Sequence, residues 1–164
     1  MTRERMKRSV SVAIRCAQAD GAERVVAVLR PDSPDDPLGG LWGLPAATAR
    51  DGESEDEAAA RVLRDKLGLR VPAEGLTRIS EGRRDDGASS QSMTVYALDW
   101  DEDSPLPVSL PARSVDSEST VTLYEDWRWA APDELREAAR RGSLCTRLYL
   151  KWLGDALDSS LRSE

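Results

Sequence analysis

The sequence of 164 residues contains no histidine, and this absence removes whole classes of active site. Histidine is the commonest general base and the commonest metal ligand in proteins. Catalytic triads built on histidine, and zinc sites that include it, are therefore excluded. Any acid–base or metal chemistry in this chain must rest on carboxylates.

Cysteine is almost as scarce. The two cysteines, Cys16 and Cys145, lie near opposite ends of the chain and belong to no metal-binding or redox motif. This pattern fits a reducing cytoplasm better than a secreted domain stapled by disulfides, and it favours packing roles for both thiols. We therefore expect a cytoplasmic protein.

Long apolar runs are also missing. No segment approaches the length and apolarity of a membrane span, and the basic start is followed by an alternating pattern instead of the continuous apolar run of a signal peptide. The net charge of −7 argues against a broad basic surface, which supplies most non-specific affinity for nucleic acid. The sequence predicts neither a membrane nor a nucleic-acid polymer as partner, and it leaves a free nucleotide open.

The length suits one well-packed domain, which we expect to span residues 1–164. Apolar and polar residues alternate over 9–16 with the two-residue period of a half-buried strand, and 24–29 forms a second strand candidate that would complete a hairpin. Later segments carry further extended or strand patterns at 41–45, 76–83, 93–100 and 121–129.

Loops and helices are predicted between these strands. Proline, acid and small polar residues concentrate at 31–40 and 101–119, where we expect mobile loops, and 85–90 has the composition of a flexible connection. A helix is predicted from Ser54, a capping residue with Glu57 three positions later, to Leu67, with Gly68 as the stop. Two more helices are expected, at 132–140 and 144–157.

A motif runs through the predicted first helix, in the segment LWGLPAATARDGESEDEAAARVLRDKLGL at residues 41–69. Glu53 is followed at characteristic spacings by Arg61, an apolar residue, Gly68 and Leu69. The segment resembles the Nudix box of the nucleoside-diphosphate hydrolase superfamily, beginning at Ala47 and ending at Leu69. The resemblance implies an α/β/α sandwich with a mixed β-sheet, the box helix on one face and the C-terminal helix on the other.

The same resemblance shows where this box is degenerate. The three glutamates of the family pattern are here Val62, Asp65 and Lys66. In an ordinary member their carboxylates project from one helix face and hold magnesium against the pyrophosphate of the substrate. Valine offers no ligand and lysine offers a cation, so we expect any Mg²⁺ to bind weakly. Ala46-Ala47 replaces a glycine pair, which keeps a carbonyl available as a ligand and restricts positive φ.

The resemblance also implies roles for individual residues if the protein is an enzyme. Glu53, Asp65 and the carbonyl of Ala47 would hold magnesium, and Arg61 would orient Glu53 by bracing the loop against the helix. An acid from a later loop would assist the attack of water, and Glu125 is the chosen candidate, with Glu118 and Asp126 as alternatives.

Three functions remain open. The chain is a pyrophosphohydrolase with a weakened or altered metal site, acting on a nucleoside-diphosphate-linked or related phosphorylated small molecule. Alternatively it is a non-catalytic binding or regulatory module, in which Arg64 or Lys66 contacts phosphate and Trp129 stacks on a base. The third option is a structural partner in an assembly, for which a homodimer is one form.

Simpler structural interpretations stand beside these roles. A lysine late in a helix is usually solvated, and an acid such as Asp65 between two basic residues is often a surface ion-pair partner. Val62 would widen the buried stripe of the helix. Trp127 and Trp129 share one face of a strand, where core packing is the commoner fate of at least one.

Overall fold

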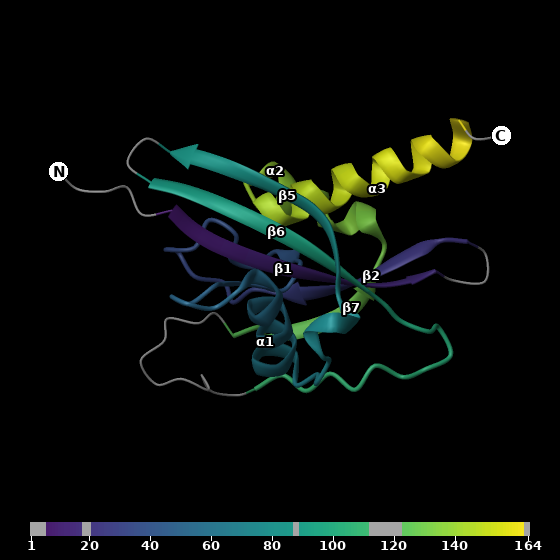
Figure 1. Cartoon of the computed structure of the whole chain (residues 1–164), viewed down its shortest axis with the longest axis horizontal. Helices are drawn as coiled ribbons and strands as arrows, with labels where there is room; N and C mark the ends of the chain where they lie inside the picture. The colour runs from purple at the N-terminus through teal and green to yellow at the C-terminus, as the bar shows by residue number, and fades with distance from the viewer. Residues whose placement is uncertain (1–5, 18–20, 87–88, 112–122, 163–164) are drawn as a thin grey trace.

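The computed structural model describes residues 6–17, 21–86, 89–111 and 123–162, and it places a mixed β-sheet between helices on both of its faces (Figure 1). This is the predicted α/β/α architecture. The strands are β1 (Met6–Ala17), β2 (Glu23–Leu29), β3 (Trp42–Gly43), β4 (Ala46–Thr48), β5 (Thr77–Asp86), β6 (Ser89–Asp99) and β7 (Asp126–Ala130). They run in the order β3-β2-β1-β6-β5, with β4 paired to β1 and β7 paired to β2.

The two longest pairings organise the sheet. Strand β1 lies parallel to β6, whereas β5 and β6 form an antiparallel hairpin whose register reaches Asp86 opposite Ser89. The expectation of a flexible connection over 85–90 is therefore wrong, because most of that segment belongs to the two strands. Backbone hydrogen bonds extend the ladder here through residues whose side chains are polar, which the apolar periodicity did not reveal.

Strand β1 changes its antiparallel partner along its length. Near its end it pairs with β2, with Arg15 opposite Val25, which confirms the predicted hairpin. Near its start it pairs with β4 instead, with Ser9 opposite Thr48. The chain between β3 and β4 crosses β1 at this point. The carbonyl of Pro45 accepts hydrogen bonds from the Val12 amide at 3.2 Å and from the Ser11 hydroxyl at 2.8 Å. A pocket lies beside this crossing.

Helix α1 (Glu55–Leu67) covers one face of the sheet and matches the predicted box helix. It begins after Ser54, whose Oγ accepts from the Glu57 amide at 3.1 Å, and it ends at Gly68, whose φ of 69° is in the left-handed region. Val62 is 1% exposed and lies in the apolar cluster between α1 and the sheet, which confirms its packing role.

The other face is covered by the C-terminal helices. A 3-10 turn (Pro132–Leu135) leads into α2 (Arg136–Arg140), and α3 (Leu144–Arg162) follows. The predicted helices are confirmed, and α3 is longer than expected. Tyr149 is fully buried in a second apolar cluster, which lies between the sheet and these helices. Its hydroxyl donates to Glu23 at 2.9 Å and so connects α3 to β2.

The predicted loops differ in how they are held. Residues 31–40 form turns without helix or strand, as expected. Residues 101–111 are also irregular, but they pack on α1: Leu106 is buried, and the Ser109 amide donates to the Leu67 carbonyl at 2.8 Å. The rest of the predicted 101–119 loop and the start of the predicted strand at 121–129 lie outside the described residues. A short 3-10 helix (Ala73–Gly75) follows α1. In the described part of the chain no helix is long and apolar enough to cross a membrane.

Candidate functional site: a cationic pocket beside the box helix

A pocket of about 560 Å³ lies between the loop before α1 and the start of α3. This volume falls within the range of small-molecule binding sites. Its lining contains several basic side chains and no acidic one among the described residues, although the whole chain carries a net charge of −7. The basic residues are Lys7, Arg30, Arg50, Arg61, Lys66 and Arg84. The pocket therefore favours an anionic ligand.

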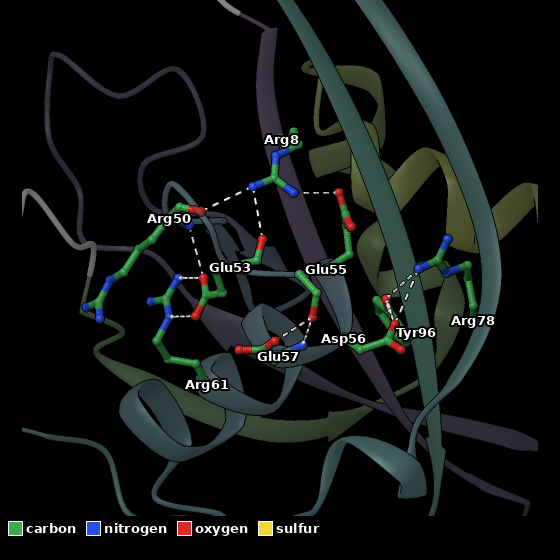
Figure 2. A network of polar contacts seen from close by, with 10 residues as sticks. Arg8, Arg50, Glu53, Glu55, Asp56, Glu57, Arg61, Arg78 and Tyr96 are labelled. Carbon is green, nitrogen blue, oxygen red and sulfur yellow. Dashed lines mark hydrogen bonds and ion pairs between the residues drawn. The ribbon is translucent and has the colours of Figure 1, made fainter.

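Arg61 braces the loop that leads into α1. Its Nε donates to Glu53 Oε2 at 2.9 Å and its Nη2 donates to Glu53 Oε1 at 3.0 Å (Figure 2). The same Nη2 donates to the Thr48 carbonyl at 2.9 Å. Arg61 is 6% exposed, and its hydrogen bonds hold the pKa of the Glu53 carboxyl below its usual range. The predicted Glu53–Arg61 brace is confirmed, and it engages both oxygens of the carboxylate that was also expected to hold metal.

Arg8 of β1 holds the same loop from the sheet side. Its Nη1 donates to Glu55 at 2.9 Å, and its Nη2 donates to the carbonyls of Arg50 at 3.1 Å and Glu53 at 3.0 Å (Figure 2). This ion pair lowers the pKa of Glu55. Arg8 could not be identified from the sequence, because nothing in the local pattern of a strand indicates contact with a loop more than forty residues later.

The remaining acids at the start of α1 also have partners. Asp56 accepts a hydrogen bond from the Tyr96 hydroxyl and one from Arg78 at 3.3 Å, and these contacts lower its pKa (Figure 2). Glu57 accepts from the Ser54 hydroxyl at 3.2 Å. These carboxylates stabilise the helix start and its attachment to the sheet.

The residues at the family's metal positions do not fit a divalent cation. Asp65 pairs with Arg64 at 3.1 Å and does not line the pocket, while Val62 is buried in the core. Within the described residues no group of three or more acids or cysteines is placed to hold a metal ion. Magnesium needs several hard oxygen ligands, and the three family positions offer one carboxylate, which already has a partner.

Lys66 takes a buried position that the sequence interpretation did not favour. The expectation of a solvated lysine is wrong, because its side chain is 7% exposed and donates a hydrogen bond to the Ala46 carbonyl. Its ammonium lies 5.1 Å from the centre of the Tyr124 ring. Burial lowers the pKa of Lys66 to about 8, and the nearby charges of Arg30 and Arg61 add to the shift. The lysine points back toward β4 because that strand packs against the last turns of α1.

The alanine pair at the start of the box adopts an extended conformation in β4, so it needs no positive φ. The amide of Ala46 donates to the Tyr124 hydroxyl at 2.9 Å, and the same hydroxyl lies 3.3 Å from the Ala46 carbonyl. Tyr124 and Lys66 thus both contact the Ala46 carbonyl, and Tyr124 also contacts the Ala46 amide. Ala47 lines the pocket beside it.

Other predicted site residues lie away from this pocket. Arg64 has a side chain that is 57% exposed and pairs with its neighbour. Glu125 is exposed, and its amide donates to Leu29 at 2.9 Å. Trp129 is half-buried against the α1 cluster together with Trp127, as the shared-face argument predicted. Glu118 lies outside the described residues. The metal, catalytic and base-stacking roles of these residues stay predictions.

Several pocket residues were missed by sequence reasoning. Lys7 lies in β1, Arg30 directly follows β2, and Arg84 lies in β5. Arg84 donates to the Gly142 carbonyl just before α3. None of them stands in a motif. Their common feature is their position in the folded sheet, so only the strand order brings them together.

A Nudix-type architecture is defined by this mixed sheet, by the braced loop and helix at its centre, and by the helices on the opposite face. The sequence profile of the NUDIX domain matches residues 7–153, and the chain belongs to this family. Among curated proteins none matches the sequence.

Solved structures share the fold. A Caenorhabditis elegans Ap4A hydrolase in a binary complex superposes with a TM-score of 0.60 and 17% identity, over 91% of this chain and 98% of that chain. The NUDIX domain of Shewanella oneidensis NrtR complexed with ADP ribose superposes with a TM-score of 0.60 and 16% identity, over 94% of this chain and 90% of that chain. The Nudix hydrolase RenU from M. smegmatis superposes with a TM-score of 0.55 and 26% identity, over 83% of this chain and 78% of that chain.

Proposed function

We propose that the protein binds a nucleoside-diphosphate-linked or related phosphorylated small molecule in the cationic pocket, and that conventional magnesium-dependent hydrolysis of such a ligand is compromised. The observation that carries this proposal is the composition of the pocket wall. Six basic residues and no acid line it within the described chain, in a protein that is acidic as a whole.

Phosphate is the anion that this wall suits best. Guanidinium groups match phosphate oxygens in geometry and keep their charge at every physiological pH, and an ammonium adds a point charge. The volume of about 560 Å³ leaves room for more than an isolated phosphate. Two proteins with the same fold are described with compounds of this class: one is an Ap4A hydrolase, and the other is complexed with ADP ribose.

The binding role is favoured over catalysis by the electrostatics of the box. A hydrolase of this family uses magnesium to offset the charge of the pyrophosphate and to activate water. Here the acids around the loop are engaged by arginines, and a buried lysine stands at one metal position. These contacts support a pocket that binds a phosphorylated ligand and does not bind a metal ion.

Calorimetry combined with product analysis tests this function. ADP-ribose and diadenosine tetraphosphate would be titrated into the protein, with adenosine as the control that lacks phosphate, and the same mixtures with Mg²⁺ would be separated by chromatography. We expect binding of at least one phosphorylated probe, no binding of adenosine and no appreciable cleavage. Rapid magnesium-dependent cleavage, or equal binding of adenosine, would contradict the proposal.

A further inference from the structure

The most unusual group in the molecule is the ammonium of Lys66. Lys66 is 7% exposed, and no carboxylate lies within ion-pair distance of its ammonium among the residues that the structure describes. Its polar partner is the neutral carbonyl of Ala46, and its other neighbour is the ring of Tyr124. Burial of an ionised group without an opposite charge costs free energy.

The neighbours of Lys66 increase this cost. Arg30 after β2, Arg61 on the same helix and Lys7 on β1 all act on it as like charges. Arg30 is paired with Asp36 at 2.8 Å and Arg61 with Glu53, so these two are neutralised locally. Lys66 itself lines the pocket, and no carboxylate of the described residues forms an ion pair with it.

Lys66 stands at a position of the box where the family pattern places a metal ligand. Lys66 occupies the last of three positions that share one helix face, where the family pattern has a carboxylate for magnesium. Its ammonium donates to the carbonyl of Ala46, which directly precedes Ala47, the residue whose carbonyl was expected to bind that metal. The positive charge next to the helix and the loop therefore belongs to a side chain of the protein and not to a bound metal ion.

We propose that the Lys66 ammonium takes the electrostatic role of the metal ion, so that the phosphorylated ligand binds directly and without a divalent cation. This inference rests on the proposed function, since it needs a phosphate-bearing ligand in the pocket. An anion beside Lys66 supplies the missing counter-charge and offsets the cost of burial. Free Mg²⁺ then does not strengthen binding, because it competes with Lys66 for the same phosphate oxygens.

The first experiment uses the wild-type protein alone. ADP-ribose is titrated by calorimetry in buffer with EDTA and again in buffer with millimolar Mg²⁺. We expect binding in EDTA with an affinity equal to or higher than that in Mg²⁺. Binding that requires Mg²⁺ would overturn this inference and leave the proposed ligand class standing.

The second experiment removes the charge. Lys66→Met keeps a long unbranched side chain suited to a buried position, and Lys151→Met removes an exposed lysine on α3 as the matched control. We expect Lys66→Met to weaken ADP-ribose binding on the order of tenfold to a hundredfold, as for loss of one charged hydrogen bond. Lys151→Met should bind as the wild type does.

The outcomes separate the two proposals. A folded Lys66→Met protein that binds as tightly as the wild type would show that Lys66 only fastens β4, and would overturn the inference alone. A wild type that binds no phosphorylated probe in either buffer overturns the proposed function and the inference with it. If Lys66→Met fails to fold, the comparison of EDTA and Mg²⁺ still decides, because it needs no variant.

Discussion

The guanidinium of Arg61 holds both carboxylate oxygens of Glu53, with Nε–Oε2 and Nη2–Oε1 distances of 2.9 and 3.0 Å. The pair is largely buried, with side chains that are 8% and 14% exposed. The pair fixes the loop before α1 beside the basic pocket. The contact therefore persists as a structural element, and its energetic role can be measured.

Arg61→Ala should lower the free energy of unfolding, because it leaves Glu53 and the Thr48 carbonyl without their donor. Loss of a charged hydrogen-bond partner costs on the order of 1.5–3 kcal/mol. Urea unfolding measures the change, and Arg64→Ala is the control on the exposed side of the same helix. Equal stability of the two variants would contradict a structural role for the brace.

The stability of the protein should rise with pH in the window set by Lys66. The pKa of this lysine is about 8 in the folded protein and 10.5 in the unfolded chain. Between these values the unfolded chain binds the proton more tightly, so each increase in pH favours the folded state. The cost of burying the charge is fully present below pH 8 and is absent above pH 10.5, and it amounts to about 3 kcal/mol.

Unfolding by urea across that pH range checks this prediction by comparison with Lys66→Met. Because the variant shares the other titrating groups, the difference between the two curves reports Lys66. The difference in the free energy of unfolding between the wild type and Lys66→Met should become smaller as the pH rises, because Lys66 loses its charge in the folded wild type. A constant gap would mean that Lys66 titrates alike in both states and is not desolvated.

Restoring the acid at position 62 should destabilise the fold instead of rebuilding a metal site. Val62 is 1% exposed within the α1 cluster, so Val62→Glu places a carboxylate among apolar side chains. The cost is roughly 3 kcal/mol or more. Ala60→Glu, on the same helix but outside that cluster, is the matched control.

The double variant with Lys66→Glu extends the test. If it folds and binds Mg²⁺ clearly better than the wild type, the helix face can still form a metal site and the box register is supported. If it folds and gains no affinity for Mg²⁺, the correspondence of positions 62, 65 and 66 to the family glutamates is wrong. Thermal melting with and without Mg²⁺ provides the measurement.

Magnesium should also leave the stability of the wild-type protein unchanged. A ligand that binds only the folded state raises the melting temperature, and the box lacks the ligand set that would provide such binding. Melting curves in EDTA and in millimolar Mg²⁺ should therefore coincide. A clear rise with Mg²⁺ would indicate ligands that complete the site from elsewhere in the chain.

Gly68 should be less replaceable than Gly52, although both have positive φ, 69° and 79°. A Cβ at Gly68 would lie 2.9 Å from the Ser109 carbonyl oxygen, whereas a Cβ at Gly52 meets nothing within 4 Å. Backbone strain alone costs alanine about 1 kcal/mol at either site. Gly68→Ala should cost clearly more, because the segment that packs on α1 must also move. Equal losses would show that this segment adapts freely.

Local features of the sequence were enough to predict the box helix and its brace. Ser54 and Gly68 determine where α1 begins and ends, because the capping hydrogen bonds and the left-handed turn involve only nearby residues. Glu53 and Arg61 are eight positions apart, and the loop and helix between them bring their side chains together. The strand periodicity likewise predicted the core strands of the sheet, since alternation reports which face is buried.

The environment of Lys66 and the charge of the pocket were decided only by the tertiary structure. A lysine at the end of an amphipathic helix is equally consistent with a solvated and a buried side chain, and the difference depends on what packs beside it. Here β4 and Tyr124 do so, and Ala46 and Tyr124 are 78 residues apart in the sequence. The pocket collects its cations from separate strands, a loop and a helix, whose order in the sheet is set by long-range pairing and burial and is not encoded in the local pattern of any one of them.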